Sequence, residues 1–289
     1  MGVLEDMRLV VLGCGYSARA FVDLMTPASV VGTTRSEDRA ASLRALGIEP
    51  VVVTDGTTPA LDHAIKAATH IIVSAAPGPQ GDPFLPHLSE AFSSAAALTW
   101  VGYLSTIGVY GDYQGGAVDE EAETRAQSDR GRWRIAAEAA WMAFGKEQGV
   151  PVGVFRLAGI YGPGRNTFVA LRDGRAKRII KPGQVFNRIH VSDIAATLKA
   201  ASTQAAGGIF NVADNEPAPP EEVVTFAAKL MGVEPPPRVP FDEAQMSPMA
   251  RSFYGEVKRI INARIRSELG VILTYPTYRE GLTTLWQDN

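Results

Sequence analysis

The chain has 289 residues, of which 46% are hydrophobic and 20% charged, which allows one large α/β unit or a main domain with a smaller one. Its formal net charge of −3 at pH 7 argues against nucleic acid and anionic membranes as partners. Cys14 is the single cysteine, which excludes an intrachain disulfide. Without a signal-peptide pattern, a run of 18 apolar residues or metal-ligand spacing, we expect a cytoplasmic protein with no transmembrane helix and no metal site.

Short β-branched runs alternate with alanine-rich helical segments through the first part of the chain. We expect strands within residues 8–13, 29–34, 49–55, 70–76, 99–106 and 150–162. These runs lack polar alternation, which is typical of strands that are buried on both faces of a parallel sheet. Together with the helices between them, they predict a Rossmann-type, doubly wound α/β fold.

The alternation ends after about residue 163. The stretch "KRIIKPGQVFNRIHV" predicts two short strands around a Pro-Gly turn, and "SDIAATLKAAS" predicts a helix with Ser192 as its N-cap. A further strand is expected at "GIFNVAD". These segments lead us to expect two units, with a dinucleotide-binding domain at residues 1–162 plus 184–213 and a smaller substrate-binding cap at residues 163–183 plus 214–289.

The first strand leads into a glycine-rich loop, "VVLGCGYSARAF", with the pattern G-x-G-x-x-A. Gly13 permits a tight turn, Gly15 lets a pyrophosphate approach the backbone, and Ala18 lets the helix pack closely on the sheet. The first helical residues, Tyr16 and Ser17, bring backbone N–H groups and positive potential to the phosphates. A strand, a glycine loop and a helix in this order predict a dinucleotide site.

The second strand indicates which dinucleotide binds. An NAD site usually has Asp or Glu near the end of this strand, whereas Arg35 stands here between Thr34 and Ser36. A guanidinium beside hydroxyl groups suits a 2′-phosphate, which favours NADP. In the alternative, Arg35 is a solvated loop residue, Glu37 or Asp38 reaches the ribose, and the cofactor is NAD.

Several later segments carry a resemblance to a known family. They are "VVVTDG", "VSAAP", "LSTIGVYGD", "FRLAGIYGPGRN", "NRIHVSDIA" and "ELGVILTYPTYREGL". With the glycine loop, they resemble the extended short-chain dehydrogenase/reductase superfamily in its epimerase/dehydratase branch, over nearly the whole chain. The resemblance implies that Asp55 contacts adenine, that Leu157 belongs to a segment touching nicotinamide, and that Thr106 carries the active-site hydroxyl. It also implies a cofactor-lining segment made of Ser74, Ala75 and Ala76.

The helix that begins at "RGRWRIAAEAAW" departs from the family pattern. Members carry Tyr-x-x-x-Lys on this helix with a Glu four residues after the Lys, and Glu138 fixes the register here. Arg130 then takes the place of the tyrosine and Arg134 that of the lysine, so the chain is similar to an atypical subgroup that lacks this pair. Arginine does not donate a proton near neutral pH, because its pKa exceeds about 12. We expect Arg134 to hold ribose hydroxyls and Arg130 to bind an anionic or polar group.

Proton transfer would then fall to another group, with His190, Tyr110 and Tyr161 as candidates. His190 has a suitable ordinary pKa, about 6.5, but it is also the kind of residue that ties a strand end to the next helix. The two tyrosines match family positions that usually shape the pocket. The donors expected to bind the substrate beyond the cofactor are Arg165, Asn166 and Arg188.

The resemblance implies an NAD(P)-binding, epimerase/dehydratase-like oxidoreductase that acts on a small polar or anionic substrate, such as a sugar nucleotide. The alternative is a regulator or redox sensor that binds NADP without catalysis. The family also implies a homodimer, which would pair the helices at about 84–97 and 129–145 with their copies. Trp141 and Phe144 are the candidate interface residues, with packing inside the monomer as the alternative.

Overall fold

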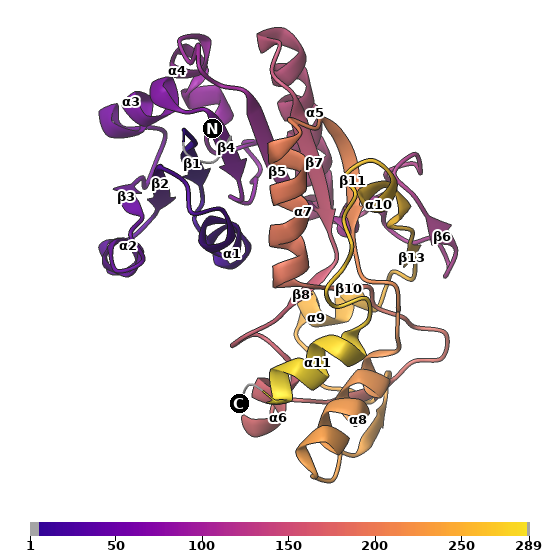
Figure 1. The fold of residues 1–289 in the computed structure, drawn as a ribbon. Helices are drawn as coiled ribbons and strands as arrows, with labels where there is room; N and C mark the ends of the chain where they lie inside the picture. Colours follow the sequence, from indigo (N-terminus) through magenta and orange to yellow (C-terminus); the bar gives the residue numbers. More distant parts are fainter. Residues whose placement is uncertain (1–5, 288–289) are drawn as a thin grey trace.

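A seven-stranded sheet forms the centre of the computed structural model, which describes residues 6–287. Its strand order is β11-β7-β5-β4-β1-β2-β3, and every neighbouring pair is parallel (Figure 1). The strands are β1 (Arg8–Leu12), β2 (Ser29–Thr34), β3 (Glu49–Val52), β4 (His70–Val73), β5 (Trp100–Thr106), β7 (Val152–Leu157) and β11 (Gly208–Val212). The order reverses between β1 and β4, which confirms the doubly wound fold predicted from the sequence.

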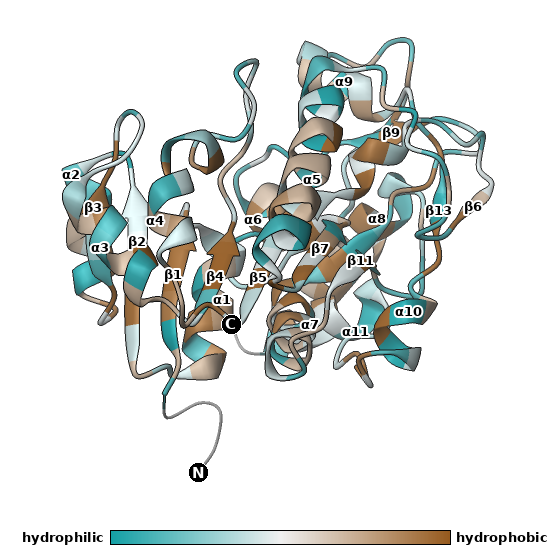
Figure 2. Ribbon diagram, turned by 90° about the horizontal axis from the view of Figure 1, so that it is seen from above, coloured by the Kyte–Doolittle hydropathy of each residue, from teal (hydrophilic) through white to brown (hydrophobic). Residues whose placement is uncertain are grey.

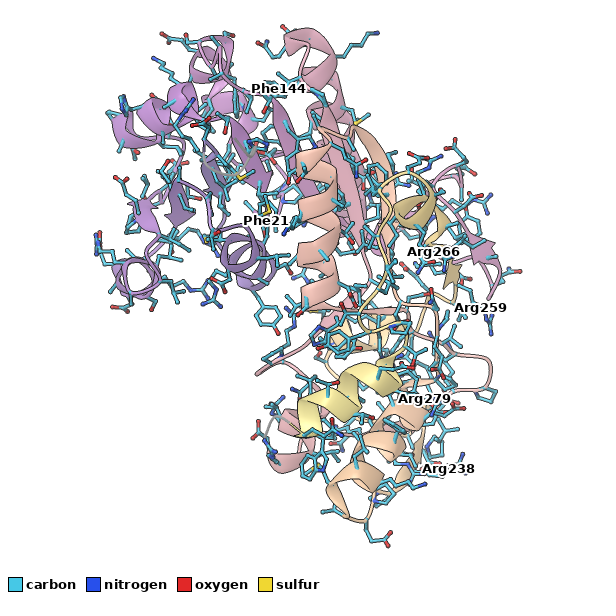
Figure 3. All side chains as sticks on the ribbon, in the orientation of Figure 1. Phe21, Phe144, Arg238, Arg259, Arg266 and Arg279 are labelled. Atoms are coloured by element: carbon cyan, nitrogen blue, oxygen red, sulfur yellow. The ribbon has the colours of Figure 1, made fainter. Side chains whose placement is uncertain are left out.

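Helices cover both faces of this sheet, each with its own apolar layer. The helices on one face are α1 (Tyr16–Met25), α2 (Glu37–Arg44) and α7 (Val191–Thr203), and those on the other are α3 (Pro59–Ala67), α4 (Ser89–Ser93) and α5 (Asp129–Gln148). Phe21 of α1 belongs to the first layer and Phe144 of α5 to the second (Figure 3). Figure 2 shows hydrophobic strands in the sheet, with helices around them that carry both hydrophilic and hydrophobic residues. Among residues 6–287, no helix is long and apolar enough to cross a membrane.

A smaller unit lies at one end of the sheet (Figure 1). Its helices and strands, with those that join it to the sheet, are β6 (Ala117–Val118), β8 (Gly159–Tyr161), α6 (Thr167–Arg172), β9 (Arg178–Ile180), β10 (Arg188–His190), α8 (Pro220–Met231), β12 (Arg238–Pro240), α9 (Pro248–Phe253), β13 (Arg259–Ile260), α10 (Ala263–Ser267) and α11 (Tyr278–Gln287). Two apolar clusters of its own hold it together, one around Phe168 and Tyr278 and one around Tyr254. Four exposed arginines lie apart along the outer edge of the molecule in Figure 3, at Arg238, Arg259, Arg266 and Arg279.

The apolar cores do not follow the boundary between the two units that was predicted at residue 214. Ile260, Ile265 and Val271 are buried in the layer that contains α1 and α7, although the prediction assigned them to the cap. The reason is that the chain returns from the smaller unit to the large sheet, where α10 packs against β11. The rest of the predicted division stays a prediction.

The two short strands predicted around the Pro-Gly turn are present as β9 and β10, which pair in parallel with β12 and β8. Two local predictions are corrected by the structure. The helix expected at about 84–97 is reduced to a 3-10 turn, η1 (Leu85–His87), and the short α4, which ends at Ser93. The helix expected from Ser192 begins one residue earlier, and His190 is its N-cap.

The two residues proposed for a dimer interface lie inside the monomer. Trp141 is fully buried, donates from its ring Nε1 to Asp82 at 2.9 Å, and stacks on Tyr103. Phe144 is buried against Trp141 and Phe92. Their apolar surface is therefore already covered, and the homodimer stays a prediction without them.

Candidate active site

The glycine loop forms a tightly packed turn after β1. Gly13 has φ +85°, and the amide nitrogens of Gly13 and Cys14 donate to the hydroxyl (2.7 Å) and carbonyl (3.0 Å) of Thr33 in β2. A Cβ atom at Gly13 would lie 2.7 Å from the amide nitrogen of Ala75, which follows β4. Only glycine fits here, because both the backbone angle and the space exclude a side chain. The loop is thus held between the ends of β2 and β4.

The start of α1 presents hydrogen-bond donors that the protein does not use. No described residue accepts a hydrogen bond from the amides of Tyr16, Ser17 or Ala18, and the N-cap, Gly15, brings no side chain to them. A Cβ atom at Gly15 would meet only the carbonyl oxygen of Gly13 at 3.9 Å, so the backbone faces open space. Free amides at an open helix N-terminus fit a phosphate group. The residues therefore fit the pyrophosphate of a dinucleotide.

The next two strand ends place polar residues beside this loop. Thr34 ends β2, and its carbonyl accepts a hydrogen bond from Val53 after β3 at 2.8 Å. Arg35, Ser36 and Asp55 follow these strands and are exposed. The Ser36 hydroxyl makes no capping bond to α2, so it stays available to a ligand.

Cys14 serves as packing material within the loop. A Cβ atom at Gly32 would lie 3.0 Å from the Cβ of Cys14, so the cysteine fills the space above β2. Burial raises the pKa of the Cys14 thiol to about 11. The thiol therefore stays protonated and unreactive near neutral pH.

The remaining predicted cofactor residues lie at the ends of β4, β5 and β7. The amides of Ser74 and Ala75 both donate to the carbonyl of Leu12, at 2.8 and 3.0 Å, which ties this segment to the glycine loop. Thr106 and Leu157 are register partners at the ends of β5 and β7. The Thr106 Oγ1 accepts a hydrogen bond from the amide of Gly108 at 3.1 Å, which leaves its proton for another acceptor. Neighbouring parallel strands thus bring these residues, together with the exposed Ala76, to one edge of the sheet.

Arg134 is anchored to β5 by one of its nitrogens. Its Nη1 donates to the hydroxyl of Tyr103 at 3.0 Å and to the carbonyl of Leu104 at 2.9 Å. Burial raises the pKa of Tyr103 to about 12, so this hydroxyl stays protonated near neutral pH. No described residue accepts a hydrogen bond from the other guanidinium nitrogens. Arg134 is therefore a fixed cation near the carboxyl end of β5, with donors left for a ligand.

Arg130 lies one turn earlier on the same face of α5 and is exposed. Its Nη1 is 3.4 Å from the Sδ of Met249 in α9, so the guanidinium reaches toward the smaller unit. Arg132 points elsewhere, since it is bound to Asp129 and to the carbonyl of Gln127 at the surface. Arg130 and Arg134 thus lie on one face of α5, whereas Arg132 is held at the surface by Asp129.

Glu138 pairs with Arg156 of β7, and not with Arg134 as a helix-surface pair would. Arg156 donates to it in a bidentate arrangement, with Nη2 2.8 Å from Oε2, and both side chains are about 95% buried. Ser105 of β5 donates to the same carboxylate. Glu138 faces inward because α5 lies across β5 and β7. Helical spacing alone cannot show whether Glu138 pairs with Arg156 or with Arg134. The pair holds α5, and so Arg130 and Arg134, at a fixed position over the sheet.

His190 caps α7 and is shielded from the expected chemistry. Its Nδ1 accepts a hydrogen bond from the amide of Ser192 at 3.2 Å, and Tyr161 and Tyr275 enclose its ring. Burial lowers the pKa of His190 to about 4, so the ring is neutral near pH 7. Its Nε2 has no hydrogen-bond partner within the described part of the chain. The structure thus favours the capping interpretation over general acid–base catalysis.

Four other predicted residues are engaged within the protein. Tyr110 is fully buried and donates to Asn211 at 2.7 Å, and burial raises the pKa of Tyr161 well above its usual range. Both ends of the Asn166 side-chain amide are used, one by Val169 of α6 and one by the carbonyl of Gly162. Arg188 donates to the carbonyls of Phe186 and Ala218. The role of these four side chains in the active site stays a prediction.

Some residues of the site were not predicted from the sequence. Tyr103 and Arg156 became visible only once β5, β7 and α5 were packed, although a charged residue inside the apolar run "VGVFRLAG" was a signal for Arg156. Asp214 is also buried, and burial raises its pKa to about 7. Among residues 6–287, no group of three His, Cys, Asp or Glu side chains is placed to hold a metal ion.

Known proteins are similar to this chain in sequence and in fold. The chain is 30% identical over 264 residues to protein YeeZ of Escherichia coli K12, which covers 86% of this chain and 88% of YeeZ. A functionally unknown conserved protein from Silicibacter pomeroyi, of known structure, is 47% identical with a TM-score of 0.88, over 97% of this chain and 98% of that one. The human epimerase family protein SDR39U1, solved with NADPH, has a TM-score of 0.74 at 15% identity, over 97% and 100% of the two chains.

The chain belongs to the same family as protein YeeZ and the Silicibacter pomeroyi protein. It has the NAD(P)-dependent epimerase/dehydratase type of fold, which confirms the resemblance. No family model matches the sequence.

Proposed function

We propose that the chain is an NADP-dependent oxidoreductase of the extended short-chain dehydrogenase/reductase type, acting on a small polar or anionic substrate such as a sugar nucleotide. The observation that carries the proposal is the set of three free amides at the start of α1, between Gly13 and Gly15 on one side and the end of β4 on the other. A dinucleotide pyrophosphate satisfies these donors. SDR39U1, which has this fold, was solved with NADPH.

The preference for NADP rests on the end of β2. Arg35 and Ser36 are exposed there, and no described residue accepts a hydrogen bond from the Arg35 guanidinium. The N-terminus of α2 adds positive potential, although Glu37 and Asp38 in its first turn reduce it. A 2′-phosphate would gain a charge-assisted bond to Arg35 and the hydroxyl of Ser36.

Replacing Arg35 with alanine is expected to weaken NADPH binding and leave NADH binding almost unchanged. One lost charge-assisted hydrogen bond corresponds to a loss of roughly tenfold or more in affinity. Fluorescence titration with each dinucleotide measures both constants. Equal losses for NADPH and NADH would show that Arg35 does not read the 2′-phosphate, and the NADP assignment would be wrong.

The arginines define the chemistry that we propose. The bound dinucleotide supplies the hydride donor or acceptor. Arg130 binds an anionic group of the substrate, Arg134 holds the nicotinamide ribose and adds positive charge, and Thr106 donates a hydrogen bond to the substrate oxygen. Positive charge stabilises an oxygen that becomes negative during hydride transfer, which needs no tyrosine. A proton would come from solvent, since His190, Tyr110 and Tyr161 are buried.

A second candidate function is an NADP-binding regulator or redox sensor without catalysis. It is favoured by one observation, namely that the three candidate proton donors, His190, Tyr110 and Tyr161, are buried. Saturating the protein with NADPH and screening sugar nucleotides, keto acids and aldehydes for NADPH oxidation separates the two. Turnover supports the enzyme, whereas saturable binding with no turnover across the panel supports the regulator.

A further inference from the structure

Tyr16 joins the dinucleotide loop to a turn that leads into the smaller unit. Tyr16 is the first residue of α1, and its hydroxyl donates to the carbonyl of Pro163 at 2.9 Å. The guanidinium carbon of Arg165, two residues on, lies 5.8 Å from the centre of the Tyr16 ring, within the range of a cation–π contact. Residues 147 positions apart thus meet beside the free amides of α1.

The turn that carries Arg165 is rigid. Gly162 and Arg165 exchange two backbone hydrogen bonds of 2.9 and 3.1 Å, and Asn166 donates to the Gly162 carbonyl at 2.9 Å. A Cβ atom at Gly162 would lie 2.6 Å from the Tyr16 hydroxyl and 2.7 Å from Val191, so the turn is pressed against α1 and the start of α7. Arg165 is therefore presented from a fixed backbone at a fixed place.

The Arg165 side chain has no acidic partner within residues 6–287. It is exposed, and its guanidinium lies over the ring of Tyr16. Arg19, one turn into α1, is a second positive charge beside Tyr16, and its effect on the Tyr16 pKa has the same sign as that of Arg165. Positive side chains and the free N–H groups of the helix start are thus gathered at one place, which favours an anion.

We propose that Arg165 binds the pyrophosphate of the dinucleotide from the side opposite the glycine loop, with Tyr16 as its positioning residue. The proposal rests on the proposed function, because it needs a dinucleotide at the start of α1. It reassigns Arg165, which the sequence led us to place in the substrate site. The turn at 162–165 then closes over the cofactor phosphates, and the substrate lies farther along the edge of the sheet, toward Arg130.

Arg165→Met tests the proposal by titration with both NADPH and NADH. We expect both affinities to fall by roughly tenfold, because the pyrophosphate is common to the two dinucleotides. Arg165→Lys should recover part of the loss, since lysine keeps the charge without the planar fork. Arg172→Met is the matched control, because Arg172 stands over Trp286 in a similar contact, 5.9 Å away, on α6. It should bind both dinucleotides as the unmodified protein does.

Tyr16→Phe tests the positioning role, since it removes only the hydroxyl that holds Pro163. It should weaken NADPH binding less than Arg165→Met, and the double variant should bind no more weakly than Arg165→Met alone, because the two act through one contact. Additive losses would overturn the positioning role. Unchanged dinucleotide affinity in Arg165→Met, with or without loss of turnover, would overturn the pyrophosphate assignment. Unmodified protein that binds neither dinucleotide would instead overturn the proposed function, and this proposal with it.

Discussion

Replacing Glu138 with alanine is expected to lower the free energy of unfolding by about 3–5 kcal/mol. The substitution leaves the guanidinium of Arg156 buried beneath α5 without its counter-ion, and Nη1 of that arginine already has no hydrogen-bond partner in the described part of the chain. Ser105 also loses its acceptor. An uncompensated buried charge costs far more than the removed contact, because the low-dielectric interior cannot solvate it.

Urea unfolding of Glu138→Ala and of a matched control measures this effect. Asp129→Ala is the control, because Asp129 lies on the same helix and also pairs with an arginine, Arg132, but at the surface. Its unfolding free energy should fall by less than about 1 kcal/mol. Similar losses in the two variants would show that the Glu138–Arg156 pair is not an important support of α5.

Replacing Gly13 with alanine is expected to abolish measurable NADPH binding and to lower the melting temperature. The φ of +85° disfavours any side chain, and the new Cβ would lie 2.7 Å from the amide nitrogen of Ala75, a backbone atom that cannot turn aside. Either the glycine loop or the end of β4 must move. Both flank the free amides of α1, so the phosphate site is lost with the movement.

Gly149→Ala provides the control for backbone strain alone. Gly149 has φ +67° at the end of α5, and a Cβ atom there would meet nothing within 4 Å. It should lower the melting temperature slightly and leave NADPH binding intact, as measured by differential scanning fluorimetry and fluorescence titration. Tight NADPH binding by Gly13→Ala would contradict the assignment of this loop.

Local patterns were enough to predict the fold and the glycine turn after β1. The β-branched runs predicted the strands, because strands that are buried on both faces of a parallel sheet are continuously hydrophobic in sequence. The spacing of Gly13, Gly15 and Ala18 predicted the glycine loop, because a tight turn and a close approach to the backbone both require residues without a side chain at the two glycine positions. Arg130 and Arg134 could be placed together because both lie on one helix, where four-residue spacing fixes a shared face.

Contacts between distant segments could not be predicted in the same way. Glu138 has Arg134 one turn away in sequence, yet its partner is Arg156, because the direction in which α5 crosses the sheet decides which side chains meet. The bond from Tyr16 to Pro163 depends likewise on how the smaller unit returns to α1.

We propose that arginines replace the tyrosine and lysine of extended short-chain dehydrogenases/reductases beside a bound dinucleotide. Titrating the unmodified protein, Arg134→Met and Arg130→Met with NADPH tests it most directly. We expect saturable binding by the unmodified protein, severalfold weaker binding by Arg134→Met, and unchanged binding by Arg130→Met, which should instead lose turnover of any substrate found in the screen. NADPH binding that is equally tight in Arg134→Met and the unmodified protein would contradict the claim.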